Sequence, residues 1–435
     1  MNALNRSLVE LASRYASWRR VSLWRVGHLA ASRGSFFVDL RDGRRHCQTN
    51  TYSRVLQWFA DHWPADLEWP PDTPRPVRCG RGSADRADPG RGAASRTVSG
   101  LTADVEALLS FKNGLIDSAG LNWSADRDLG EWHGVTTGGT PPRVTELEVS
   151  ARGVRGTIAP VLGDLTHLTR LWLPDNRLTG SIPGALGRLT HLTSLVLWGN
   201  ELSGPIPREL GALERLATLS LSRNRLSGRI PRELCRLSEL RFLFLFGNRL
   251  TGPIPSELGG LSRLSELVMS ENRLNGSIPR ALGELANLVR LSLCGNELSG
   301  AIPAELAALR NLEVLDLTAN RLSGSIPTQL GRLTRLERLR MDGNRLTGPL
   351  PAEFGGLANL RRLEVGGNRL NGPVPHQFGG LRRLVTLDLG DNDFRGPLPR
   401  GLEALTSLRV LRTSGNPSIS RSIPRTLQDA LLACG

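Results

Sequence analysis

Asparagine recurs every 24 residues from Asn176 to Asn416, without a slip in the spacing. Around each asparagine the sequence follows the pattern LxxLxLxxNxLxGxIPxxLGxL, as in residues 168–189. A weaker copy, in which Arg152 replaces the asparagine, starts at Val144, which gives 12 units ending near Leu431. A fixed period of this length is typical of arrays in which each unit stacks on its neighbours. We therefore expect a solenoid rather than a fold built around a single core.

Each fixed position of the unit has a structural role. In residues 171–173 (LWL) the alternation predicts a short strand with its leucines inward and its central residue outward. The asparagine ends the strand, and its amide satisfies buried backbone groups, so that stacked asparagines form a ladder. Gly180 allows a tight or positive-φ turn. Ile182 and Pro183 cover the core on the far side, where the backbone is expected to join no regular ladder.

The LxGxIPxxLGxL half of the unit resembles the plant-type leucine-rich-repeat family, and the resemblance runs from about Leu101 to Leu431. The segment DVEALLSFKNGL at residues 104–115, with LNWSADRDLGEWHGVTT after it, is similar to that family's N-terminal cap. The resemblance implies an α/β repeat fold, a curved solenoid with a parallel sheet on its concave face. It also implies a pair of cap cysteines, but those places hold Gly130 and Thr137 here. No kinase signature follows the array.

The chain is divided by composition into five segments. Residues 1–69 are predicted to form a small all-α, basic N-terminal domain, since they show no repeat and carry five of the nine tryptophans. Residues 70–100 are rich in Pro, Gly and Arg and are predicted to be a flexible linker. The cap is assigned to residues 101–143, the twelve repeats to residues 144–431 and a short tail to residues 432–435.

The N-terminal domain has two interpretations. Two short predicted helices joined at the sequence SRG are typical of a helix-turn-helix, and the segment resembles small bacterial proteins of that kind. The phosphate contacts would then be Arg33, Arg41, Arg44 and Arg45. The alternative, a small helical bundle with a solvated basic face, is favoured, and an accidental gene fusion is a third possibility.

Sequence motifs of catalysis are missing from the chain. It contains no G-x-S-x-G, P-loop, HExxH or dinucleotide-binding motif. Its five cysteines have neither metal-site nor disulfide-framework spacing. We therefore expect no enzyme, no cofactor and no metal. The N-terminus has no secretory signal and no apolar run of about 18 residues occurs, so we expect a cytoplasmic protein with free thiols and no transmembrane segment.

The outward strand positions predict where a partner binds. Early units carry clustered aromatic residues, which are typical of interface hot spots: Trp172, Trp198, Phe242, Phe244 and Phe246. Late units carry charges, among them Arg338, Arg340 and Arg362, although Asp316, Arg340 and Glu364 alternate in sign and so can compensate one another. We expect a noncatalytic scaffold that binds a protein partner through the concave face. The alternative is a DNA-associated regulator whose N-terminal domain binds nucleic acid while the repeats sense a partner.

A column of arginines along one rim of the array also bears on partner binding. Arginine follows the asparagine in seven units, from Arg177 to Arg369, along one rim of the array. Such a column has the charge to bind a polyanion. Because Glu201, Glu297 and Asp393 interrupt it, and backbone carbonyls can accept its hydrogen bonds, the favoured interpretation is a solvated rim.

Overall fold

The structure is a computed structural model that describes residues 12–13 and 99–419. The chain divides into two compact units, residues 1–93 and 94–435. Of the first unit only Ala12 and Ser13, both helical, are described. The expected domain of residues 1–69, nearly all of the linker, the end of the last repeat and the C-terminal tail therefore lie outside the described residues.

The cap comprises helix α5 (Ser99–Asn113), strands β1 (Leu115–Asp117) and β2 (Val135–Gly138), and the 3-10 helix η1 (Leu129–Glu131). Its core is aromatic. The ring of the fully buried Trp123 stacks on that of Trp132, with centroids 5.7 Å apart, and meets that of Phe111 at 6.2 Å. The indole nitrogen of Trp123 donates to the carbonyl of His133 at 2.9 Å. Aromatic packing thus forms the core of the cap.

A buried ion pair joins the cap helix to the first repeat. Asp104 of α5 is only 1% exposed, and its two carboxylate oxygens accept hydrogen bonds from Arg143 at 2.8 and 2.9 Å. The amide of Val144 donates to the same carboxylate at 2.8 Å. The hydrogen bond to Asp104 raises the pKa of Arg143 further above its usual range. The hydrogen bonds and the guanidinium charge offset the cost of removing the carboxylate from water.

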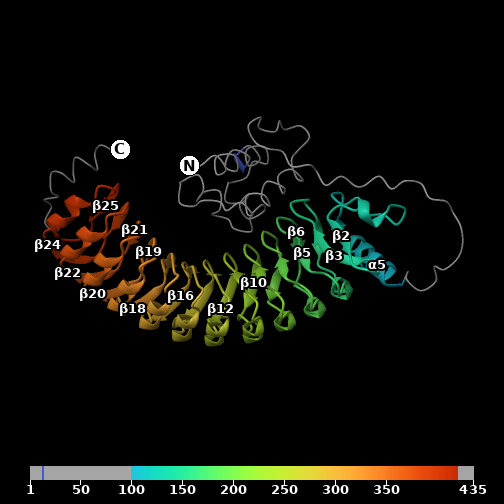
Figure 1. Cartoon of the computed structure of the whole chain (residues 1–435), viewed down its shortest axis with the longest axis horizontal. Coiled ribbons are helices and arrows are strands. Elements are labelled where there is room, and N and C mark those ends of the chain that lie inside the picture. Colours follow the sequence, from blue (N-terminus) through green and yellow to red (C-terminus); the bar gives the residue numbers. More distant parts are fainter. Residues whose placement is uncertain (1–11, 14–98, 420–435) are drawn as a thin grey trace, which may run out of the picture. The chain divides into compact units, whose positions relative to one another are not determined.

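The main sheet follows the inner side of the arc formed by the repeats (Figure 1). It has 13 strands; β2 pairs antiparallel with β3, and all later pairs are parallel. The core leucines Leu171, Leu195 and Leu219 lie in register and are fully buried, as predicted. Each unit contributes one strand: β3 (Arg143–Glu148), β5 (Arg170–Trp172), β7 (Ser194–Val196), β9 (Thr218–Ser220), β11 (Phe242–Phe244), β13 (Glu266–Val268), β15 (Arg290–Ser292), β17 (Val314–Asp316), β19 (Arg338–Arg340), β21 (Arg362–Glu364), β23 (Thr386–Asp388) and β25 (Val410–Arg412).

A second set of strands follows the asparagine of each unit, and the sequence interpretation missed it. These strands form a 3-stranded sheet, β1-β4-β6, and a 10-stranded sheet from β8 to β26. The segment expected to join no ladder, Ile182 and Pro183, lies outside these strands; the residues that pair are those shortly before it, Arg177–Thr179 in the second unit. The strands are β4 (Arg155–Thr157), β6 (Arg177–Thr179), β8 (Ser203–Pro205), β10 (Arg225–Gly228), β12 (Arg249–Pro253), β14 (Arg273–Gly276), β16 (Glu297–Gly300), β18 (Arg321–Ser325), β20 (Arg345–Gly348), β22 (Arg369–Gly372), β24 (Asp393–Gly396) and β26 (Ser418–Ile419).

Short 3-10 helices form the convex side of the array (Figure 1). From η3 onward each begins directly after a proline, whose fixed φ, −68° at Pro183, prepares the turn. No helix in residues 99–419 is long and apolar enough to cross a membrane. The 3-10 helices are η2 (Pro160–Asp164), η3 (Gly184–Arg188), η4 (Arg208–Ala212), η5 (Arg232–Arg236), η6 (Ser256–Gly260), η7 (Arg280–Glu284), η8 (Ala304–Ala308), η9 (Thr328–Arg332), η10 (Ala352–Gly356), η11 (His376–Gly380) and η12 (Arg400–Ala404).

Glycine in these helices lets successive units approach closely. A Cβ added to Gly211 would lie 2.3 Å from the carbonyl oxygen of Glu233 in the next unit. Cys235 occupies the equivalent place in η5 and carries a free thiol, which is half-buried. Burial, with the nearby Glu257 and Glu233, raises the pKa of the Cys235 thiol to about 11, so that it is neutral at physiological pH.

The asparagine ladder has the predicted geometry. The Asn296 side chain is 8% exposed, and its Nδ2 donates to the carbonyls of Met269, Leu293 and Cys294 at 3.0, 2.9 and 3.3 Å. Its Oδ1 accepts from the amide of Leu274 at 3.0 Å. One amide therefore satisfies backbone groups of its own unit and of the unit before it, and so ties them together. At the next corner Gly180 and its equivalents take positive φ, +75° at Gly180 itself.

Candidate binding face of the main sheet

The aromatic half of the concave face is built on strands β5 and β11 and on the turns that follow β7 and β11. Trp172 ends β5, and Phe242 and Phe244 flank the fully buried Leu243 in β11, so their rings face away from the core. Trp198 and Phe246 were expected at strand positions, but they lie two residues beyond the ends of β7 and β11. We refer to these five aromatic residues as the aromatic half.

The backbone ladder continues past the strand ends and holds the last two rings in register. The amide of Gly199 donates to the carbonyl of Ser222 at 3.0 Å, and the amide of Arg223 donates to the carbonyl of Phe246 at 2.8 Å. Trp198, Ser222 and Phe246 therefore occupy one column on three successive units. This registration explains why rings outside the strands still belong to the same face.

All five rings are half-buried rather than exposed. The reason lies in their neighbours. Phe244 pairs with Ser220 on one side and Val268 on the other, and these small residues are only 7% and 6% exposed although they also face outward. Ser222, between Trp198 and Phe246, is fully buried, and within the described residues its hydroxyl has no hydrogen-bond partner. Large rings that lie over small neighbours account both for the half-burial of the rings and for the low exposure of the small outward residues.

Local contacts hold several of the rings in place. The indole nitrogen of Trp172 donates to the hydroxyl of Ser194 at 2.7 Å, and the guanidinium of Arg170 lies 5.9 Å from its ring centroid. The rings of Phe242 and Phe244 stack at 6.2 Å with an interplanar angle of 19°. Such contacts fix the side-chain rotamers before a partner arrives, which lowers the entropy lost on binding.

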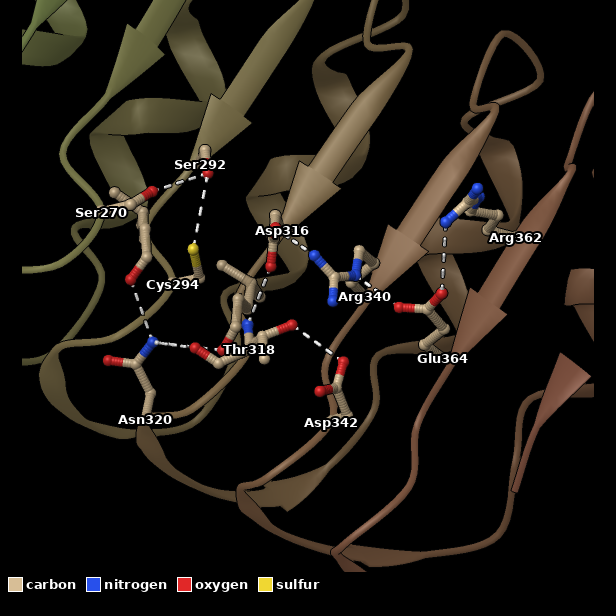
Figure 2. Close-up of polar contacts among 12 residues, drawn as sticks. Ser270, Ser292, Cys294, Asp316, Thr318, Asn320, Arg340, Asp342, Arg362 and Glu364 are labelled. Carbon is tan, nitrogen blue, oxygen red and sulfur yellow. Dashed lines mark hydrogen bonds and ion pairs between the residues drawn. The ribbon is translucent and has the colours of Figure 1, made fainter. Parts of the chain in front are cut away.

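The late units pair their charges with one another, as the alternating signs suggested (Figure 2). Arg340 lies between two carboxylates, with its Nη1 3.1 Å from Asp316 and its Nε bonded to Glu364. Arg362 lies 3.9 Å from Glu364. We refer to Asp316, Arg338, Arg340, Asp342, Arg362, Glu364, Asp388 and Arg412 as the charged half. At its far end Arg412 pairs with Asp388 at 3.2 Å.

Further polar contacts, which the sequence analysis did not identify, join Thr318 to Asp342 and Ser270 to Ser292 (Figure 2). The hydroxyl of Thr318 donates to Asp342 at 2.8 Å, and the hydroxyls of Ser270 and Ser292 are hydrogen-bonded at 2.7 Å. Burial raises the pKa of the Asp342 carboxyl above its usual value, although Thr318 and the nearby Arg340 act in the opposite direction. Burial likewise raises the pKa of the Cys294 thiol, whose sulfur lies 3.9 Å from the Ser292 hydroxyl. Part of the signal was present in the sequence, since Ser270, Cys294, Thr318 and Asp342 recur at the 24-residue period, whereas Ser292 shares the column of Asp316.

The structure thus brings the predicted contact residues together on one face, in two groups. The aromatic half lies on units 2 to 5, and the predicted arginines Arg338, Arg340 and Arg362 lie on β19 and β21. Arg340 differs from the other two because two carboxylates already bind it. The predicted nucleic-acid contacts, Arg33, Arg41, Arg44 and Arg45, lie outside the described residues. Within residues 99–419 no three His, Cys, Asp or Glu side chains are placed to hold a metal ion.

Comparison with known families agrees with this geometry. The leucine-rich-repeat profiles match residues 167–189, 190–250, 263–285, 287–346 and 310–370. The profile of the leucine-rich-repeat N-terminal domain matches residues 101–136. The chain is a plant-type leucine-rich-repeat protein. Its N-terminal domain match coincides with the cap, even though the cap carries Gly130 and Thr137 at the cysteine places.

Similar proteins come from Arabidopsis thaliana. A segment of 81 residues is 41% identical to the LRR receptor-like serine/threonine-protein kinase FEI 2, over 18% of this chain and 14% of that protein. The ectodomain of the plant membrane receptor kinase GASSHO1/SCHENGEN3, solved with CASPARIAN STRIP INTEGRITY FACTOR 2, is 35% identical over 76% of this chain and 43% of its own, with a TM-score of 0.71. The Arabidopsis receptor kinase HAESA, solved with the peptide hormone IDA and the co-receptor SERK1, is 34% identical over 73% of this chain and 54% of its own, with a TM-score of 0.66.

The chain therefore spans about half the length of these solved chains and a small part of FEI 2. One of the solved neighbours is by name an ectodomain of a membrane receptor. The expectation of a cytoplasmic protein consequently finds no support in the comparisons. They give none to a nucleic-acid partner either.

Proposed function

We propose that this leucine-rich-repeat protein is a noncatalytic binding scaffold that recognises a peptide or protein partner across its concave sheet, with the aromatic half as the main contact. One observation carries the proposal. Phe242, Phe244 and Phe246 gather on the outward side of a single unit although the leucine core beneath them is already complete, with Leu243 and Leu245 fully buried.

The two halves of the face differ in the free energy that a partner gains by contacting them. In the charged half Asp316, Arg340 and Glu364 satisfy one another, so a partner that displaces these ion pairs gains little net free energy. In the aromatic half each ring is partly exposed and held in position. Completing the burial of such a ring contributes about 0.5–1 kcal/mol, at most roughly a third of the value for full burial.

Arg338 and Arg362 extend the proposed site. They lie side by side on the paired strands β19 and β21, and the Arg362 side chain is 54% exposed. A partner that covers the rings and carries an acidic group would reach these two arginines further along the face. Arg340 contributes by fixing the carboxylates around it rather than as a free contact.

The class of partner is argued from the solved neighbours. HAESA is bound to a peptide hormone and GASSHO1/SCHENGEN3 to CASPARIAN STRIP INTEGRITY FACTOR 2, as their names state. Their repeat arrays align with about three quarters of this chain. An extended peptide is therefore the first partner to test.

The test is a selection from a random-peptide display library with the full chain as bait. Enriched peptides are then measured against the variant Trp198→Ser/Phe244→Ser. We expect their affinity to fall about tenfold or more, since two hot-spot rings are lost. The matched variant is Arg338→Ser/Arg362→Ser, which alters two positions of the same face in the charged half and should weaken binding less.

Two results would contradict the proposal. One is that no peptide is enriched over a control selection on a chain carrying all five aromatic-to-serine changes. The other is that the double aromatic variant folds and binds every enriched peptide as tightly as the unchanged protein.

A further inference from the structure

We infer that a second binding surface lies on the 10-stranded sheet, where two rows of arginine fit an acidic polysaccharide. The rows occupy the position directly after the asparagine. One consists of Arg225, Arg249 and Arg273 on strands β10, β12 and β14; the other consists of Arg321, Arg345 and Arg369 on strands β18, β20 and β22. Strand β16, which carries Glu297, separates the rows.

The structure shows which of these arginines are already paired. The first member of each row bonds to a carboxylate one unit earlier in the same column: Arg225 to Glu201 at 2.9 Å and Arg321 to Glu297 at 3.1 Å. The other members have an arginine, not an acid, one unit earlier. Among the described residues Arg249, Arg273, Arg345 and Arg369 are all exposed and form no ion pair.

This arrangement differs from the solvated rim that the sequence favoured. Acids at Glu201 and Glu297 do not interrupt the column at random, because each neutralises only the first arginine that follows it. What remains is two runs of uncompensated positive charge on adjacent strands, which lie about 4.8 Å apart. The register sets Arg249 opposite Ser227 and Arg345 opposite Ser323, so successive arginines are diagonal neighbours and, within residues 99–419, none of these four gains an ion pair from the fold. A polyanion would supply the missing negative charge.

The neighbouring column identifies the kind of polyanion. Two residues after each arginine, on the same side of the strand, stands a hydroxyl or amide side chain, such as Thr347 beside Arg345 and Asn371 beside Arg369. A chain of sugars with one anionic group per ring presents both an anion and hydroxyl groups at each step. Single-stranded nucleic acid also needs aromatic platforms for its bases, and the only aromatic ring among the strands of this sheet from β8 to β24 is that of the buried Phe394.

The site is tested with the full chain and two commercial polysaccharides, sulfated heparin and carboxylated polygalacturonate, as a function of salt. The site variant is Arg249→Gln/Arg273→Gln/Arg345→Gln/Arg369→Gln. The matched control, Arg208→Gln/Arg232→Gln/Arg280→Gln/Arg332→Gln, removes the same charge from exposed arginines of the 3-10 helices. Because the N-terminal segment is unchanged in both, its own attraction for polyanions cancels in the comparison.

We expect the site variant to bind at least one of the two polysaccharides about tenfold more weakly, with a shallower dependence on salt, while the control loses no more than about twofold. The polysaccharide that responds tells whether sulfate or carboxylate is the preferred anion. Equal losses in the two variants, or no loss in either, would overturn the inference. So would duplex DNA that binds more tightly than both polysaccharides and depends on the same four arginines.

Discussion

The aromatic and charged halves of the concave face share one backbone and one core, yet they satisfy their outward side chains by opposite means. Leu243 in the first half and Leu339 in the second are equally buried, and each is followed by a ladder asparagine. Above this common base, Arg340 bonds to carboxylates on both neighbouring strands. Phe244 has no charge to pair and instead lies over the small residues on either side.

The difference separates what a repeat array needs for folding from what it can vary. Inward leucines and asparagines are fixed by the stacking of units, whereas outward residues are constrained only by the same column of the next unit. In the charged half, acidic and basic side chains pair with one another. The aromatic half leaves part of each ring exposed, and this is the reason for placing the partner there.

The largest expected effect tests the base that the two halves share. Replacing Asn224 by alanine in the aromatic half, or Asn344 in the charged half, removes four hydrogen bonds to buried backbone groups. Each variant should lose about 2–3 kcal/mol of unfolding free energy, as expected for buried groups left unpaired. Chemical denaturation measures both. Losses that differ by more than about 1 kcal/mol would show that the halves do not rest on equivalent ladders.

The next effect is confined to the charged half. Arg340→Met leaves Asp316 and Glu364 without their shared cation, and Asp316 is only 8% exposed. We expect a loss of about 1–2 kcal/mol, below the value for a fully buried pair because Arg340 is partly exposed. The control is Arg412→Met, whose side chain is 68% exposed and should cost less than about 0.5 kcal/mol. An equal cost for both variants would contradict the closed network.

A smaller loss is expected in the aromatic half. Phe244→Ala uncovers Ser220 and Val268 and removes a half-buried ring, which should lower the unfolding free energy by about 1 kcal/mol. Thermal denaturation measures it, and Val410→Ala, at an exposed strand position of the last unit, is the control. A loss above about 3 kcal/mol would mean that the ring belongs to the core.

These features differ in how well they could be predicted from the sequence. The leucine column, the asparagine ladder and the turn at Gly180 were predictable, since each depends only on a residue type and the 24-residue period. The pairing of Asp316, Arg340 and Glu364 was also predictable from sign and register.

Other features depend on geometry that the period does not reveal. The half-burial of the rings follows from how a large side chain lies over its small neighbours, which a pattern of inward and outward positions does not contain. The bond from Arg143 to Asp104 joins residues 39 apart in different elements. The second strand of each unit escaped notice because it has only one inward leucine, such as Leu226 in β10, and so lacks the LxL alternation that marks the first strand.

The smallest expected effect is a gain in stability rather than a loss. Burial raises the pKa of Asp342 in the folded chain, so the folded state favours the protonated form, and stability falls as the pH rises from the ordinary aspartate pKa through the raised one. Asp342→Asn removes this cost while its amide oxygen can still accept from Thr318. We expect a slightly higher thermal midpoint than that of the unchanged protein at pH 7, and no gain at pH 3. A gain that is equal at both pH values would assign the effect to something other than titration.

The most direct test of the account is where a bound partner protects the concave face. Hydroxyl-radical footprinting compares the full chain alone and with a peptide enriched by display selection, and reads oxidation at each side chain. We expect strong protection of Trp198, Phe242, Phe244 and Phe246, with unchanged oxidation of Ile116 in the cap, whose side chain is 77% exposed. Protection that is absent from these four rings while the peptide is bound would contradict the assignment of the aromatic half as the binding surface.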